Sequence, residues 1–360
     1  MTGMLPLFSS PSEIARVVEE ARREVRYVIT DFSAELLSLK FKEIDHKTTS
    51  ASDIDEGDIY IPSYQRELTW PEDNWSYFIE SLILRFPIPP VFLYDVDGRL
   101  EVVDGSQRLR CINKFFKDEF ALQGLEKIEI LNGFRFSDLP SAIQRRIQNT
   151  PIRTFILDNS TDATTCVELF RRLNTTGERL TDAEIRKGAF RGPFLDLVIE
   201  CADSTAFRNL THSISDLKDP GGERQELVTR FFVYLQNYLE FKHDVRKFLD
   251  KKMIEYNKIL STIEIERLRI EFYSTMAFIF DNYRTAFYKT ERGTKLARVR
   301  FEAVAVGTAL ALRKNPKLRV KSANWLKSKE FNRHARTEAS NSAPKLRARI
   351  EFIRDNLLGT

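Results

Sequence analysis

The sequence contains few of the residues that mark secreted, zinc-binding or membrane-spanning proteins. Its three cysteines lie far apart and show no CxxC spacing, so neither a disulfide framework nor a thiolate zinc site is predicted. No apolar run approaches the roughly 20 residues that a membrane-spanning helix needs, and the N-terminus lacks the basic start and apolar core of a signal peptide. These absences favour a soluble protein of the reducing cytoplasm with no membrane partner.

The charged residues are nearly balanced in number but unevenly placed along the chain. The formal net charge is +4 over 360 residues. From residue 293 to residue 360, however, sixteen Lys or Arg residues stand against five Asp or Glu residues, which gives this end a net charge of +11. Such an asymmetry can mark a surface for nucleic-acid phosphates or for an acidic partner, although charge runs are usually solvated helix faces.

The pattern of apolar residues divides the chain into three parts. Residues 1–50 have helical spacing and many charges, and we expect a helical lead-in. Residues 51–205 alternate short strands with helices, which predicts a small mixed sheet, and residues 124–140 within this part suggest a β-hairpin. Residues 206–360 show almost no strand signal and are typical of an all-helical domain with a basic end. The predicted fold class is therefore α+β, and the 42% hydrophobic content allows a substantial core.

One strand–turn–helix junction, in the stretch EVVDGSQRLR, groups residues that can bind a phosphate. The apolar strand ends at Asp104, Gly105 makes the turn, and helical spacing begins at Ser106. The first N–H groups of such a helix point at one spot and favour an anion, and Gly105 lets a ligand approach the backbone. Arg108 adds a planar cation suited to phosphate oxygens, and Gln107 can donate to an oxygen or orient a water. Because Asp104 would repel a phosphate unless a divalent cation lay between them, the junction predicts a Mg²⁺–nucleotide pocket.

Two further segments place polar residues where a core element ends. Gln65 and Arg66 directly follow the predicted strand IYIP, and Asn174 and Gly177 lie in a loop at the end of a predicted helix. The next helix begins at Thr181 in a sequence typical of a capping box. Each of the three clusters also has a purely structural interpretation, as a turn, a helix cap or a surface charge.

Taken in order, these segments resemble the N-terminal domain of GmrSD-type restriction proteins. That family is also called the DGQQR family or domain of unknown function family 262, and it is related to the ParB/sulfiredoxin fold. The resemblance covers about residues 55–190. The motifs that carry it are Ile61-Pro62-Ser63-Tyr64-Gln65-Arg66 with Trp70, Pro87-Ile88-Pro89-Pro90, Val103-Asp104-Gly105-Ser106-Gln107-Arg108-Leu109, and residues 170–186. The chain departs from the family pattern at Ser106, where relatives commonly have Gln.

The resemblance implies a nucleotide-binding domain, in several members an NTP-hydrolysing enzyme, that serves bacterial defence against phage or modified DNA. By this likeness Asp104 is expected to hold Mg²⁺, while Arg66 and Arg108 neutralise charge in the transition state. The implied catalytic set is Asp104, Gln107, Arg108 and Arg66. The implied nucleotide- and phosphate-binding residues are Gln65, Arg66, Gly105, Ser106, Gln107, Arg108 and Asn174. Either Gln65 or Gln107 would position the attacking water.

The second half of the chain departs from many relatives, which carry an HNH-type nuclease there. The four histidines are widely scattered and do not supply the paired histidines that such a nuclease needs. Shorter members without that nuclease tend to be encoded beside a separate effector, often a HEPN-like nuclease, and we expect such a partner. Two alternatives stay open: a non-enzymatic module gated by nucleotide, with its basic C-terminal domain on DNA, and a DNA nickase or nuclease using the ParB-like domain. The oligomeric state also stays open, a homo-oligomer included.

Overall fold

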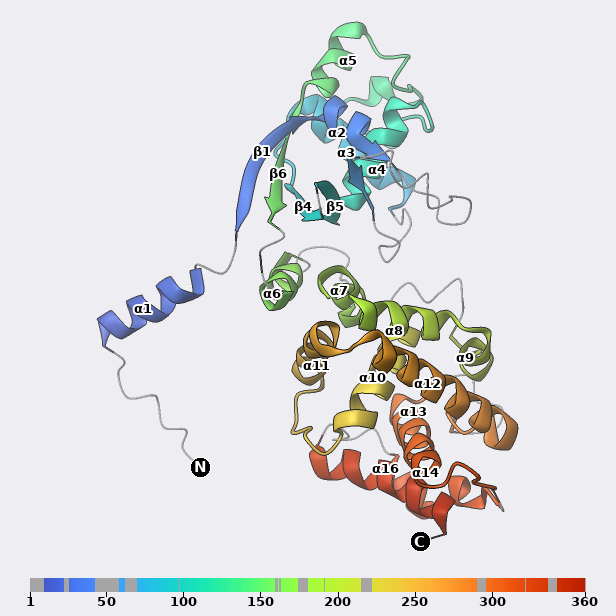
Figure 1. The fold of residues 1–360 in the computed structure, drawn as a ribbon. Coiled ribbons are helices and arrows are strands. Elements are labelled where there is room, and N and C mark those ends of the chain that lie inside the picture. The colour runs from blue at the N-terminus through green and yellow to red at the C-terminus, as the bar shows by residue number, and fades with distance from the viewer. Residues whose placement is uncertain are drawn as a thin grey trace, which may run out of the picture. The chain divides into compact units, whose positions relative to one another are not determined.

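The computed structural model of the protein, shown in Figure 1, describes residues 10–22, 26–42, 58–61, 70–96, 98–158, 161, 163–173, 181–190, 192–214, 222–289, 296–320, 322–335 and 342–359. The chain divides into two compact units, Met1–Arg179 and Leu180–Thr360. The first unit contains a mixed sheet and the described elements of the second are helices, so the predicted α+β class is confirmed. The boundary between the units lies earlier in the chain than residue 205, where the sequence pattern places it.

The first unit is built on a six-stranded mixed sheet with the order β1-β6-β4-β5-β3-β2. The strands are β1 (Tyr27–Ser33), β2 (Phe41–Lys42), β3 (Ile59–Tyr60), β4 (Val91–Val96), β5 (Arg99–Asp104) and β6 (Pro151–Leu157). β4 and β5 form an antiparallel hairpin, whereas β3 runs parallel to β5 and β6 runs parallel to β4. The carboxyl ends of β3 and β5 therefore lie at the same edge of the sheet as the amino ends of β4 and β6.

Among the described residues, four helices and one short 3-10 helix contribute to the core of the first unit: α2 (Ala34–Lys40), α3 (Glu72–Leu84), α4 (Ser106–Phe116), α5 (Ser141–Gln148) and η2 (Glu129–Leu131). The unit also contains α1 (Pro11–Arg22), whose large apolar residues are exposed, and α6 (Ala163–Leu173). β4 buries Val91 and Leu93 and leaves the alternate residues half-buried, as expected for a strand with one covered face. In α4, Leu109, Ile112 and Phe115 recur at helical spacing and join the same core.

The predicted hairpin at residues 124–140 is wrong. This segment forms a compact loop around η2, because side chains take the place of a partner strand. The Glu80 carboxylate accepts hydrogen bonds from the backbone N–H groups of Lys127 and Ile128, at 3.1 and 3.2 Å. Asn132 bonds through its side-chain amide to both backbone groups of Leu125. These contacts satisfy polar backbone groups that a β-hairpin would otherwise pair between strands.

The second unit is a bundle of helices. They are α7 (Asp182–Ala189), α8 (Pro193–Asp203), α9 (Thr205–Leu210), α10 (Glu223–Asn237), α11 (Val245–Ile259), α12 (Thr262–Tyr283), α13 (Arg298–Phe301), the π-helix η3 (Glu302–Val306), α14 (Gly307–Lys314), the 3-10 helix η4 (Asn324–Lys327), α15 (Lys329–His334) and α16 (Ala343–Leu358). The capping box predicted at the start of α7 is present, with both Thr181–Glu184 hydrogen bonds formed. In the described ranges no helix combines the length and the apolar character that crossing a lipid bilayer requires.

A chain of alternating buried charges runs through the second unit. In order, its members are Asp250, Arg186, Glu226, Arg230, Glu302 and Arg349. Arg230 donates to Glu226 at 2.8 Å and to Glu302 at 2.6 Å. Burial alone would raise the pKa of Glu226, but the adjacent Arg186 and Arg230 outweigh burial and hold that pKa below its ordinary value. The network ties α7, α10, α11, η3 and α16 together.

Candidate functional site

The β5–α4 junction has the strand–turn–helix geometry that the sequence predicts. β5 ends at Asp104, Gly105 occupies the N-cap position with φ 100° and ψ 9°, and α4 begins at Ser106. Because Gly105 has no side chain, it does not cap the first N–H groups of α4. A Cβ atom at residue 105 would lie 3.0 Å from Val91 Cγ2 and 3.1 Å from Arg108 Nη2. The left-handed backbone and the close contacts both favour glycine here.

Replacing Gly105 with alanine is expected to destabilise the first unit by about 2 kcal/mol. Two causes add up: backbone strain at positive φ, and the close contacts of the new Cβ with Val91 and Arg108. Gly98 is a matched control, because it has φ 86° and nothing within 4 Å of an added Cβ. Gly98→Ala should cost only about 1 kcal/mol, from the backbone alone. Urea unfolding of the two variants measures the difference. Equal losses would show that the contacts with Val91 and Arg108 do not matter.

Arg108 folds back from α4 across Gly105 and joins two neighbouring segments. Its Nη2 atom donates to Asp104 Oδ2 at 2.6 Å and to the carbonyl oxygen of Pro90 at 3.0 Å. The side chain of Arg108 is 13% exposed and that of Asp104 is 35% exposed. Arg108 Nε is buried and has no hydrogen-bond partner among the described residues. The two residues that the sequence assigns to metal and phosphate thus neutralise each other, and one guanidinium N–H remains to be satisfied.

Asp104 fits a metal ligand only in a limited way. Across the described ranges, no three His, Cys, Asp or Glu side chains lie close enough together to hold a metal ion. Mg²⁺ is commonly held by one or two carboxylates, with phosphate oxygens and waters completing its shell. Asp104 therefore suits a Mg²⁺ ion that arrives with a nucleotide, and the described residues do not form a metal cage of their own.

Gln107 links the start of α4 to Trp70, the residue that follows the segment of residues 62–69. Its Oε1 atom accepts a hydrogen bond from the backbone N–H of Trp70 at 3.4 Å, and the Trp70 ring packs edge-on against Phe78 at 5.8 Å between centroids. At the other end of that segment, Ile59 and Tyr60 pair in parallel with β5. Both ends of the segment are therefore held beside the junction, at the edge where β5 ends.

Three predicted site residues, Gln65, Arg66 and Asn174, lie outside the described residues. The flanks of Gln65 and Arg66 are fixed by β3 and Trp70, as above. Asn174 follows directly after α6, whose last turn carries Arg171 and Arg172. Arg172 pairs with Glu168 at 2.9 Å on an exposed helix face. The structure therefore brings Asp104, Gly105, Ser106, Gln107 and Arg108 together, and it leaves the other three as predictions.

Residues 48–191 match the family model described as the GmrSD restriction endonuclease, N-terminal domain. This part of the chain belongs to the GmrSD N-terminal domain family. The match spans every candidate residue, from Gln65 to Asn174. No curated protein matches the chain in sequence. Because the family model is described as a domain of a restriction endonuclease, the match indicates that this protein is a component of a restriction-type defence system.

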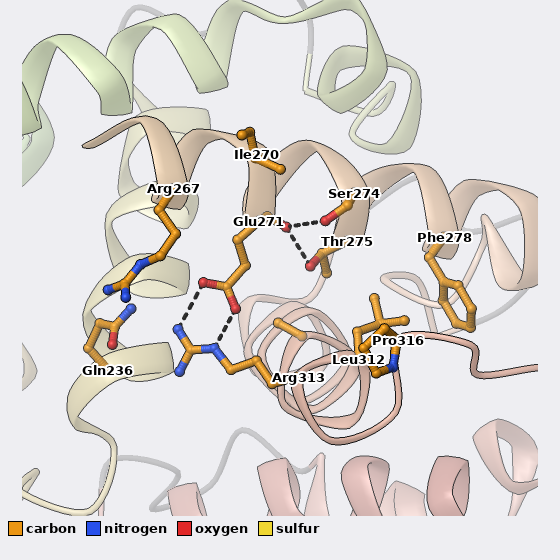
Figure 2. Close-up of a pocket in the computed structure, with 11 residues that line it drawn as sticks. Gln236, Arg267, Ile270, Glu271, Ser274, Thr275, Phe278, Leu312, Arg313 and Pro316 are labelled. Carbon is orange, nitrogen blue, oxygen red and sulfur yellow. Dashed lines mark hydrogen bonds and ion pairs between the residues drawn. The ribbon is translucent and has the colours of Figure 1, made fainter. Parts of the chain in front are cut away.

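Two cavities contain residues that the sequence did not single out. One, of about 1000 Å³, opens beside Pro90 in the first unit and is lined in part by Arg85, Arg145, Arg146 and Arg153. The other, of about 690 Å³, lies among α10, α12 and α14 of the helical unit, where Figure 2 shows the Glu271 carboxylate facing the Arg313 guanidinium. None of the described candidate residues lines either cavity. The first cavity is also lined by Pro87, Ile88 and Pro90 of the family motif, whereas its Arg145-Arg146 pair has a spacing that is ordinary for a surface helix.

Proposed function

We propose that the GmrSD domain binds a Mg²⁺–nucleoside triphosphate at the β5–α4 junction and hydrolyses it, and that the protein acts as a sensor or regulator of a restriction-type defence system. The observation that supports this most is the parallel pairing of β3 with β5. Through this pairing Ile59 and Tyr60 run toward the end of the sheet where Asp104 and α4 meet, and Gln65 and Arg66 follow within a few residues in the sequence. A separately encoded nuclease effector, of the HEPN-like kind, is the partner that we propose.

The residues of the junction have distinct roles in this proposal. The uncapped N–H groups of α4 receive phosphate oxygens, and the helix dipole favours their negative charge. Arg108 exchanges its contact with Asp104 for the triphosphate and stabilises charge that develops in the transition state. Asp104 is the residue that would hold Mg²⁺, and the bound ion would neutralise phosphate charge. Gln107 directly precedes Arg108 in α4 and orients a water.

Phosphate release tests the proposal directly. The full chain is assayed with Mg²⁺ and ATP, GTP, CTP or UTP, with and without DNA, and we expect turnover of at least one nucleotide. Asp104→Asn and Arg108→Ala should each lower kcat by about 10²- to 10³-fold, the usual cost of losing one electrostatic contact in the transition state. Lys114→Ala is the matched control, because Lys114 lies in the last turn of α4 and pairs with Glu119 at 2.7 Å. Unchanged turnover in both site variants, or no nucleotide binding by the folded protein, refutes the proposal.

A second candidate function, DNA binding by the basic C-terminal end, is favoured by one observation. Lys314, Lys317 and Arg319 are exposed and form no ion pair among the described residues. Several other cations of this end contact partners within the unit: Arg298, Arg300, Arg313, Arg349 and Arg354. Reversing the three exposed charges should abolish a salt-sensitive affinity for duplex DNA, measured by fluorescence anisotropy. Affinity that does not change with salt would exclude this function.

A further inference from the structure

The first unit contains a second charged feature, the cavity beside Pro90, which we call the arginine groove. Its charged lining is made of Arg85, Arg145, Arg146, Arg153 and Asp31. These residues come from the end of α3, the last turn of α5, and the paired strands β6 and β1. The lining therefore combines four guanidinium groups with a single carboxylate, although they are scattered over more than 100 positions in the chain.

Most of this positive charge is not neutralised. Arg85, Arg145 and Arg146 are exposed, and none of them forms an ion pair with a described residue. Arg153 donates to Asp31 at 3.1 Å, but their side chains are 61% and 45% exposed. An exposed pair of this kind contributes little and can exchange with a ligand. The groove thus presents a concentrated positive potential to an anion.

The backbone of Arg85 gives a second, independent observation. Arg85 ends α3 in the left-handed conformation, with φ 60° and ψ 34°. Glycine is the usual residue at that position of a helix end, since a side chain there adds strain. Because a strained backbone conformation often accompanies a functional side chain, the arginine at this position points to a role for its guanidinium.

Helix dipoles account for only part of the cluster. Arg145 and Arg146 lie in the last turn of α5, where the negative end of the helix dipole favours cations. The same preference applies to Arg85 at the end of α3, but it does not explain why cations from α3, α5 and β6 line one cavity. Like charges in one cavity repel, so an anionic ligand would lower the free energy of the groove.

An aromatic side chain stands among the arginines. Phe86 lines the groove next to Arg85, and the residue is 49% exposed. A positively charged groove with an exposed aromatic ring is the usual composition of a site for single-stranded nucleic acid, in which cations follow the backbone and bases stack on rings. We propose that the arginine groove binds single-stranded nucleic acid, with Arg85, Arg145 and Arg146 on its phosphates and Phe86 against a base. This binding does not depend on the proposed nucleotide site, since Asp104, Gln107 and Arg108 do not line the groove.

The test measures binding of a fluorescent twelve-residue oligo-deoxythymidine to the full chain by anisotropy over a series of salt concentrations. Arg145→Ala with Arg146→Ala should weaken binding at least tenfold and lower the salt slope by about 1.4, because each phosphate contact with a single strand contributes about 0.7. Phe86→Ala should weaken binding by about tenfold, the size expected for one stacked base. Arg85→Gly should weaken binding while keeping or raising the temperature of unfolding, because glycine suits the left-handed backbone.

A matched control removes the same charge elsewhere in the unit. Lys117 and Lys127 are exposed, lie outside the groove and form no ion pair in the described ranges. The Lys117→Ala, Lys127→Ala variant should therefore retain nearly all affinity. Equal weakening by both double variants would show unspecific attraction and overturn the proposal. It would also be overturned if the groove variants lost affinity for sodium pyrophosphate but not for the oligonucleotide, since that outcome describes a small-anion site.

Discussion

Replacing Glu302 with glutamine is expected to destabilise the helical unit by about 3–5 kcal/mol, the cost of removing one partner from a buried ion pair. Glu302 is 2% exposed and accepts hydrogen bonds from both Arg230 and Arg349. Glutamine keeps the shape of the side chain but removes the negative charge that Arg230 and Arg349 share, although Arg230 still pairs with Glu226. Chemical denaturation followed by far-UV circular dichroism measures the loss, as a shift in the transition of the helical unit.

Glu266 offers a control with the same chemistry at the surface. It pairs with Arg269 on α12, and its side chain is 53% exposed. Glu266→Gln should change stability by at most about 1 kcal/mol, because exposed pairs contribute little. If both variants lost the same stability, burial of the network would not be the cause.

Replacing Gly307 with alanine is expected to lower the free energy of unfolding. The loss should lie at the upper end of the roughly 1–3 kcal/mol that overpacking a core costs. Replacing glycine by alanine inside a helix usually stabilises a protein by about 1 kcal/mol. The loss of stability expected here is therefore opposite in sign to the usual effect. Gly307 begins α14 where α16 approaches closely, and an added Cβ would lie 2.6 Å from Ile353 Cβ and 2.7 Å from the carbonyl oxygen of Ile350. One of the two helices must move to admit the methyl group.

The same denaturation measurement checks this prediction. Lys314→Ala places alanine at an exposed position of the same helix, and its effect should stay within about 0.5 kcal/mol. A Gly307→Ala variant as stable as the natural protein would mean that α16 can shift without loss of packing.

Local sequence information was sufficient for the β5–α4 junction. An apolar strand, a glycine at positive φ and the helical spacing from Ser106 are all properties of neighbouring residues, and the structure has each of them. The capping box of Thr181 and Glu184 was predictable for the same reason, because its two hydrogen bonds join residues three apart.

Features that depend on distant residues were not predictable. The segment 124–140 has the composition of a hairpin, yet the Glu80 carboxylate from α3 binds its backbone in place of a second strand. Arg108 donates to the carbonyl oxygen of Pro90, 18 residues earlier in the chain, and nothing in the local pattern shows that its guanidinium folds back to that segment. The arginine groove joins residues from α3 and β6, which only the register of the sheet brings together.

The placement of Arg186 decides where the chain can be cut for separate study. Arg186 belongs to the last motif of the GmrSD domain, but its guanidinium is 3% exposed and pairs with Glu226 and Asp250 of the helical unit. A fragment ending at residue 191, the limit of the family match, would retain this cation and lose both of its carboxylates. Such a fragment should aggregate or need a solubilising fusion, whereas one ending before Leu180 removes α7 as a whole.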